Sequence, residues 1–234
     1  MSYNMDILEV QLVGHSFLRH LKDFCADQEI FNFDFEADKI DVRFRLTLAN
    51  GRNISNINGL DTFIQQCYEG VGSMLPEMVF LEIGSNDIHS YMQRHPHNST
   101  LQDILRSQNM AHRLMGMVDR IKSAGVRAVM VGAVLPRLAG GTYGAGQYLG
   151  RDPSEDALER AEDRGSRMTA VFNEALLVGC ENRGERVRFC KTVGLSDGWE
   201  QYIGEDGCHL DSKAANWKLF KSIRGPIIHF SKKQ

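Results

Sequence analysis

The sequence of 234 residues predicts an α/β fold: a three-layer α/β/α sandwich on a flavodoxin-like, doubly wound parallel sheet of five strands. Three observations lead to this prediction. Short runs of branched apolar residues, typical of buried strands, alternate with stretches whose apolar residues recur at helical spacing. Helical stretches of ten or more residues separate the strands, which favours right-handed crossovers between parallel neighbours. No repeat, low-complexity tract or linker interrupts this order, so we expect one domain over residues 1–234.

Five segments have the character of strands. They are residues 7–13, 39–48, 78–83, 126–135 and 187–193. The second alternates polar and apolar residues at period two, as a sheet-edge or half-exposed strand does. The third and fourth are short apolar runs, the pattern of strands buried on both faces.

Helical spacing marks the segments between and after these strands. The predicted helices are residues 17–28, 54–68, 100–124, 155–182 and 212–223. In the first, Phe17, Leu18, Leu21 and Phe24 share one face. Gly59 weakens the second. The glycine-rich segment 137–153 predicts a loop. The functional alternative is that this loop forms a rim over a site.

Composition limits the kinds of function to consider. The net charge of −3 and the pI of about 6.2 argue against a broad nucleic-acid-binding face. Five scattered cysteines without a CxxC pair indicate reduced thiols in a reducing compartment. The polar N-terminus lacks the pattern of a signal peptide, and no window approaches the roughly 20 apolar residues of a membrane span. We therefore expect a cytoplasmic protein without a transmembrane segment.

The end of the first predicted strand carries a candidate nucleophile. In folds of this class, ligands bind at the carboxyl ends of the strands. Ser16 follows Gly14 and His15 at the point where the strand ends and a helix begins. Its backbone N–H at a helix N-terminus favours a developing anion. The ordinary alternative is that Ser16 is simply an N-cap residue.

Two further motifs fall near the same edge. Asn86, just after the third strand, is placed to aim its side-chain NH₂ at an oxyanion, or else belongs to a turn that caps the next helix. Asp206 stands three residues before His209 in a late loop. A carboxylate there orients one ring nitrogen and leaves the other to accept a serine proton. The alternative is a loop histidine with an acid nearby.

Taken together, these motifs resemble the SGNH hydrolase family of GDSL-like esterases. LVGHSFLRHL resembles its nucleophile block, LEIGSNDI its asparagine block and EDGCHLD its Asp-x-x-His block, and the similarity extends over residues 9–228. The ending KLFKSIRGPII is similar to a metazoan branch of the family, some of whose members are associated with retroelements. His15 departs from the family's commoner motif, which has Asp at that position.

The resemblance implies a catalytic site. Ser16 is the expected nucleophile, His209 its base and Asp206 the residue that orients the base. The expected oxyanion hole consists of the N–H groups of Ser16 and Gly51 and the amide of Asn86. Gly59 is the alternative to Gly51.

The same resemblance implies the kind of reaction. We expect an esterase or deacetylase that cleaves short-chain acyl or acetyl esters of a small molecule or lipid, without a metal or cofactor. Two other classes stay open: a degenerate hydrolase that serves as a binding module, and the esterase part of a mobile-element protein acting near lipid or nucleic acid.

Several motifs of other enzyme classes are missing or incomplete. The sequence contains no GxxxxGK[ST] loop. His95 and His97 have no acidic or cysteine partner nearby in the sequence, so we expect no metal there. Cys208 lies inside the Asp-x-x-His loop, and we expect it to point away from the catalytic face.

Overall fold

The computed structural model describes residues 6–14, 16–27, 35–37, 40–48, 54, 76–150, 152–192, 195 and 198–231. Its strands are β1 (Asp6–Gly14), β2 (Phe35–Ala37), β3 (Ile40–Leu48), β4 (Met78–Glu82), β5 (Ala128–Gly132) and β6 (Val187–Cys190). Its α-helices are α1 (Ser16–Asp27), α3 (Ser85–Arg94), α4 (Thr100–Ser123), α5 (Glu155–Glu181) and α6 (Lys213–Ser231). Two short 3₁₀ helices are η2 (Gln147–Leu149) and η3 (Trp199–Tyr202).

The strands form one sheet in the order β2-β3-β1-β4-β5-β6. All neighbours are parallel except β2 and β3, which are antiparallel. The predicted α/β class with a parallel sheet is confirmed. The sheet has one strand more than predicted, because β2 is only three residues long and too short to show a period in the sequence.

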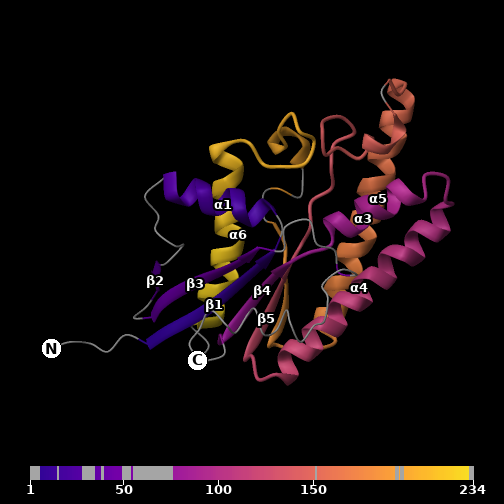
Figure 1. The fold of residues 1–234 in the computed structure, drawn as a ribbon. Helices are drawn as coiled ribbons and strands as arrows, with labels where there is room; N and C mark the ends of the chain where they lie inside the picture. Colours follow the sequence, from indigo (N-terminus) through magenta and orange to yellow (C-terminus); the bar gives the residue numbers. More distant parts are fainter. Residues whose placement is uncertain are drawn as a thin grey trace.

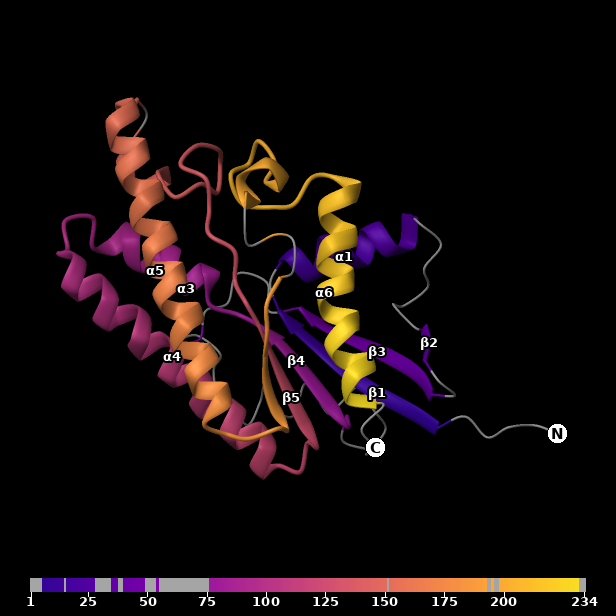
Figure 2. The same ribbon diagram turned by 180° about the vertical axis from the view of Figure 1, so that it is seen from behind.

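Helices cover both faces of the sheet. Figure 1 shows α1 and α6 on one face and α3, α4 and α5 on the other, and Figure 2 shows the same arrangement from behind. Strand β4 explains why both faces are covered: Val79 and Leu81 pack with α4 and α5, whereas Met78 and Phe80 pack with α1 and α6. Because successive side chains of a strand point to opposite faces, a strand buried on both sides must be apolar throughout.

The strand register brings the segments that follow β1 and β4 to the same edge of the sheet. Gly14 at the end of β1 lies opposite Leu48 of β3 and Glu82 of β4. The segments after β1 and β4 therefore start side by side, and these are the segments that carry Ser16 and Asn86.

The helices differ from the predictions in three places. Helix α3 was not predicted, since its ten residues follow the Gly84 turn without a long apolar period. Helix α6 continues past the predicted end at residue 223 and includes Pro226, because Ile223 and Ile227 are buried and hold the last turns against the sheet. The predicted helix 54–68 lies outside the described residues except for Ile54. No described helix combines the length and the apolar character needed to cross a bilayer.

Candidate active site

Ser16 begins helix α1 directly after β1. The last residue of β1 has no room for a side chain: a Cβ on Gly14 would lie 2.7 Å from Leu18 Cδ1 and 2.9 Å from the carbonyl oxygen of Glu82. The close approach of β1 to α1 and β4 therefore places the serine at the carboxyl edge of the sheet. Its Oγ is hydrogen-bonded to Nε2 of His209, which is 193 residues away in the sequence. His15 lies outside the described residues.

Asp206 holds the other side of the His209 ring. Its Oδ2 accepts a hydrogen bond from His209 Nδ1 at 2.5 Å. Its Oδ1 accepts the backbone N–H groups of Cys208 at 2.9 Å and His209 at 2.8 Å. With a proton on Nδ1, the lone pair of Nε2 faces the serine, which is the tautomer that a general base needs.

The hydrogen bonds of this turn also favour the charged form of Asp206. Partial burial acts to raise the pKa of its carboxyl group. The backbone and ring N–H groups of His209 and the backbone N–H of Cys208 outweigh burial, so the pKa of Asp206 lies below its usual range. Asp206 is thus an anion at neutral pH, positioned to stabilise a positive charge on His209.

Three aromatic rings surround the imidazole of His209. The ring of His20 stacks on it at a centroid distance of 4.5 Å and an interplanar angle of 8°. Phe17 lies 5.7 Å away in a tilted arrangement, and Tyr143 lies 5.8 Å away edge-on. Phe17 and His20 both come from α1, the helix that Ser16 begins. Packing from three sides restricts the ring to the orientation that meets both Ser16 and Asp206.

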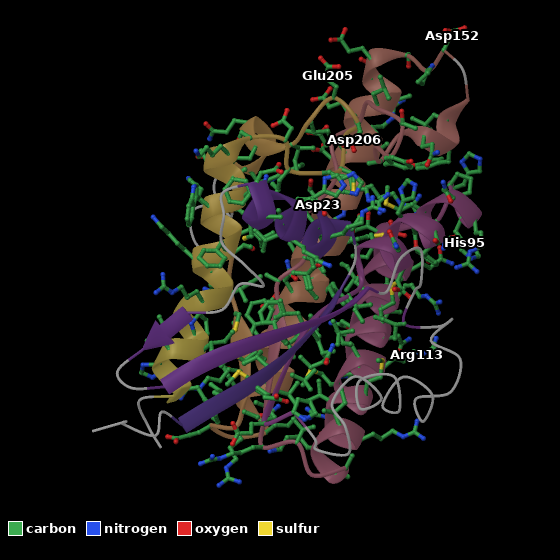
Figure 3. The ribbon with its side chains drawn as sticks, turned by 60° about the vertical axis from the view of Figure 1, so that its left-hand side comes forward. Asp23, His95, Arg113, Asp152, Glu205 and Asp206 are labelled. Atoms are coloured by element: carbon green, nitrogen blue, oxygen red, sulfur yellow. The ribbon has the colours of Figure 1, made fainter. Side chains whose placement is uncertain are left out.

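The stacked ring of His20 is kept neutral. Burial lowers its pKa, and the charges of His209 and Arg19 lower it further. The carboxylates of Asp206, in the loop before α6, and Asp23, on α1, act in the opposite direction without cancelling this effect (Figure 3). A neutral His20 leaves His209 free to accept a proton without repulsion from a second cation. His20 was not predicted as a site residue, because its only signal in the sequence is its place one helical turn after Ser16.

Asn86 lies in the first turn of α3, after a turn that also requires glycine. Gly84 has a φ of +137°, and a Cβ there would overlap the ring of Phe172. The side-chain oxygen of Asn86 accepts a hydrogen bond from Nη2 of Arg137 at 2.7 Å. Arg137 was likewise not predicted as a site residue. The signal available was an arginine after Pro136, just beyond the buried strand β5.

The glycine-rich loop after β5 packs on the turn that carries Asp206 and His209. Leu138 N–H donates to the carbonyl oxygen of Gly207 at 3.0 Å, and Tyr143 N–H donates to that of Asp206 at 2.8 Å. A Cβ on Gly144 or on Gly207 would overlap the carbonyl oxygen of Gly140. These glycines allow two backbones to meet, so the loop is a wall of the site rather than a phosphate-binding turn.

Cys208, which stands between Asp206 and His209 in the sequence, is buried. It belongs to the apolar cluster beneath α1 and α6, and burial raises the pKa of its thiol to about 11. The thiol is therefore protonated at neutral pH and directed into the core, so it is not available as a nucleophile.

The glycine expected in the oxyanion hole cannot be placed, and the described residues show no metal-binding group. Gly51 and its alternative Gly59 lie outside the described residues, and their expected place in an oxyanion hole stays a prediction. Within the described part of the chain, no group of three or more His, Cys, Asp or Glu side chains is arranged to hold a metal ion.

His89 on α3 makes the site region sensitive to acid. Burial and the charge of Arg137 lower its pKa to about 4, although a hydrogen bond from the ring to Gln147 opposes the shift. Its Nδ1 is buried and has no hydrogen-bond partner among the described residues. The native state therefore keeps His89 neutral at pH values where the unfolded chain, with a histidine pKa near 6.5, already binds a proton.

The free energy of unfolding should fall as the pH drops from 6.5 toward 4, because the unfolded state binds more protons in that range. At 1.36 kcal/mol per pKa unit, His89 should account for a loss of about 2–3 kcal/mol between pH 7 and pH 4.5. Urea unfolding at both pH values should show a smaller loss for His89→Gln than for the wild type. The exposed His97 provides the control variant His97→Gln, which should retain the wild-type loss. Equal losses in His89→Gln and the wild type would contradict the neutral buried state.

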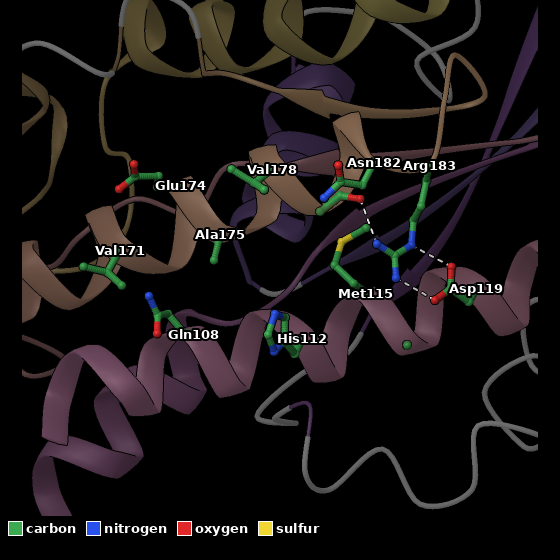
Figure 4. A pocket seen from close by; sticks show the side chains of 12 residues that line it. Gln108, His112, Met115, Asp119, Val171, Glu174, Ala175, Val178, Asn182 and Arg183 are labelled. Carbon is green, nitrogen blue, oxygen red and sulfur yellow. Dashed lines mark hydrogen bonds and ion pairs between the residues drawn. The ribbon is translucent and has the colours of Figure 1, made fainter.

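A large groove lies apart from these residues. It has a volume of about 710 Å³ and lies between α4 and α5, with Met115 and Val178 among its lining residues (Figure 4). None of the residues described above lines it, so it contributes nothing to the chemistry at the strand ends.

Solved structures with a similar fold are esterases and lipases. A lipase from a goat rumen metagenome is 14% identical with a TM-score of 0.56, and the match covers 94% of this chain and 97% of that one. A carbohydrate esterase family 3 protein from Talaromyces cellulolyticus is 13% identical with a TM-score of 0.55, covering 97% and 99%. A carbohydrate acetylesterase from Sinorhizobium meliloti is 15% identical with a TM-score of 0.55, covering 95% and 99%.

At these identities the likeness shows a shared fold over nearly the whole of each chain. No protein-family model and no curated protein sequence matches the chain.

Proposed function

We propose that this chain is a serine ester hydrolase of the SGNH type, which cleaves carboxylic esters through an acyl-enzyme on Ser16. The observation that carries the proposal is the hydrogen-bonded series from Ser16 through His209 to Asp206 at the carboxyl edge of the sheet. The fold shared with solved esterases and lipases supports it. We further assign residues 1–234 to one three-layer α/β/α domain of the flavodoxin-like type.

The first half of the reaction forms the acyl-enzyme. Ser16 Oγ attacks the ester carbonyl carbon while its proton passes to Nε2 of His209. Asp206 stabilises the resulting imidazolium through the hydrogen bond to Nδ1. When the tetrahedral intermediate collapses, the alcohol departs with the proton from Nε2, and the acyl group remains on Ser16.

The second half releases the acid. A water molecule gives a proton to Nε2 of His209 and attacks the acyl carbonyl. Collapse of the second tetrahedral intermediate returns the proton to Ser16 and frees the carboxylic acid. Every proton transfer uses the same ring nitrogen, so the fixed orientation of His209 serves both halves of the reaction.

We assign the oxyanion hole to the backbone N–H of Ser16, the backbone N–H of Gly51 and the side-chain amide of Asn86. Two features support this. Ser16 is the first residue of α1, so its N–H has no partner within the helix. The oxygen of Asn86 is bound by Arg137, which leaves the amide N–H groups on the other side of the group. Donors fixed in advance toward a developing negative charge are the largest single contribution in many hydrolases.

The substrate class and cellular setting are further parts of the proposal. We assign short-chain acyl or acetyl esters of a small molecule or lipid, with no metal or cofactor in the reaction, in keeping with the acetylesterase among the structural neighbours. The similarity of the ending to a metazoan, retroelement-associated branch favours that branch. Four described cysteines, at positions 25, 180, 190 and 208, are free thiols, which supports a cytoplasmic location.

A labelling experiment tests the proposal directly. A fluorophosphonate probe should modify Ser16, identified by peptide mass spectrometry, and labelled protein should lose its esterase activity. A series of p-nitrophenyl esters of rising acyl length should show the highest kcat/KM for the shortest chains. Active protein labelled at another serine, or not labelled at all, would refute Ser16 as the nucleophile.

A further inference from the structure

Arg137 connects the start of α3 to the loop after β5 through three different nitrogens. Its Nη2 donates to Asn86 Oδ1 at 2.7 Å and its Nε to Ser85 Oγ at 3.3 Å. Its Nη1 donates to the carbonyl oxygen of Tyr143 at 3.0 Å. We propose that Arg137 is a positioning residue for the oxyanion hole, which orients the amide of Asn86 toward the reacting carbonyl. This inference rests on the proposed function.

The direction of the Asn86 amide follows from what a guanidinium can do. An arginine side chain only donates hydrogen bonds, so the atom of Asn86 that faces it must be the oxygen. The NH₂ group then lies on the opposite side, which is the orientation that an oxyanion hole needs. Without Arg137 the amide could turn over, and its oxygen would then repel the negative charge that forms in the transition state. The charged donor also polarises the amide and strengthens its N–H groups as donors.

The ordinary role of a half-buried arginine is an ion pair, and the contacts of Arg137 do not fit that role. Among the described residues it forms no salt bridge, and all three of its hydrogen-bond acceptors are uncharged. Burial acts against its charge and lowers its pKa, with Cys208 and Asp206 opposing the shift. Keeping a cation desolvated without a bound carboxylate is costly. Its fixed planar fork is well suited to a role in positioning its neighbours.

Hydrogen bonds through Arg137 also connect the proposed oxyanion hole to Asp206 and His209. The carbonyl oxygen of Tyr143 accepts from Arg137, and the N–H of the same residue donates to the carbonyl oxygen of Asp206. A series of hydrogen bonds thus runs from Asn86 through Arg137 and Tyr143 to Asp206, and from there to His209. One side chain that the sequence motifs do not contain thus helps to set the relative placement of the hole and the base.

The test is a mutant cycle with p-nitrophenyl acetate. Asn86→Ala should lower kcat by about 10²–10³-fold, the usual cost of one oxyanion donor. Arg137→Met should lower kcat by about 10²-fold with KM changed by less than about threefold, because the loss is confined to the transition state. The double variant should be within about threefold of Asn86→Ala, because Arg137 acts through Asn86. Arg137→Lys, which retains one donor, should recover part of the loss.

Arg183 provides the matched control. Like Arg137 it makes three hydrogen bonds, two of them to Asp119 at 2.6 Å and one to the carbonyl oxygen of Gly179 at 2.8 Å, but it borders the groove between α4 and α5 (Figure 4). Arg183→Met should leave kcat unchanged. Thermal unfolding of each variant shows whether it is folded. If Arg137→Met does not fold, the kcat of Arg137→Lys tests the role of Arg137 in its place.

The outcomes separate this inference from the proposed function. A wild-type protein that neither hydrolyses esters nor reacts with fluorophosphonate refutes both. An active, Ser16-labelled wild type whose folded Arg137→Met variant keeps kcat within about threefold refutes the role of Arg137 alone. A double variant whose loss equals the product of the two single losses also refutes it, because Arg137 would then act independently of Asn86.

Discussion

Replacing Ser16 by alanine should lower kcat for ester hydrolysis by about 10⁶-fold, the loss found when a triad serine or histidine is removed. The reason is that the acyl-enzyme cannot form, so only water attack within the bound complex remains. His209→Gln should cost about as much, since glutamine cannot accept the serine proton. The double variant should be no worse than either single variant, because Ser16 and His209 act as one hydrogen-bonded unit.

Controls for these two variants come from exposed residues of the same type. Ser123→Ala and His97→Gln change exposed side chains that make no contact with the triad and should keep wild-type kcat. Burst and steady-state kinetics on p-nitrophenyl acetate give the rates, and thermal unfolding verifies the fold. Retention of more than about one hundredth of the activity in folded Ser16→Ala would show that another group is the nucleophile.

The second large effect is expected at the acid of the triad. Asp206→Asn should lower kcat by about 10⁴-fold, as the same change does in a serine protease triad. The oxygen of the new amide can still accept the backbone N–H groups of Cys208 and His209, which keeps the turn in place. Its NH₂ then faces Nδ1 of His209 and forces that nitrogen to accept. The ring proton moves to Nε2, which can no longer take the proton of Ser16.

The exposed carboxylate of Asp163 supplies the control variant Asp163→Asn, which should leave activity unchanged. In the wild type the carboxyl group of Asp206 should also stay ionised as the pH is lowered below neutrality. The hydrogen bonds of the turn hold the pKa of Asp206 below its usual range. A folded Asp206→Asn enzyme within about tenfold of wild type would indicate that His209 is oriented by its ring neighbours instead. In that case replacing His20 would be expected to cause the larger loss.

The sequence by itself determined the parts of this protein that depend on neighbouring residues. Apolar runs and helical periods predicted β1, β4, β5, α4 and α5 to within about two residues at most ends, because those patterns are carried by contiguous positions that the core buries. The pairing of Asp206 with His209 was predictable for the same reason, since three residues of a tight turn suffice to bring carboxylate and ring together.

The tertiary structure decided what depends on the order of strands. Asn86 and Arg137 are 51 residues apart and meet only because β4 and β5 are neighbours in the sheet. The stacking of His20 on His209 requires α1 to face the loop before α6, a contact between the two ends of the chain. The spacing of apolar residues within one segment does not indicate contacts of this kind between distant segments. The sequence motifs predicted the groups that we propose carry the chemistry, whereas the packing of distant segments placed around them the side chains that hold them in position.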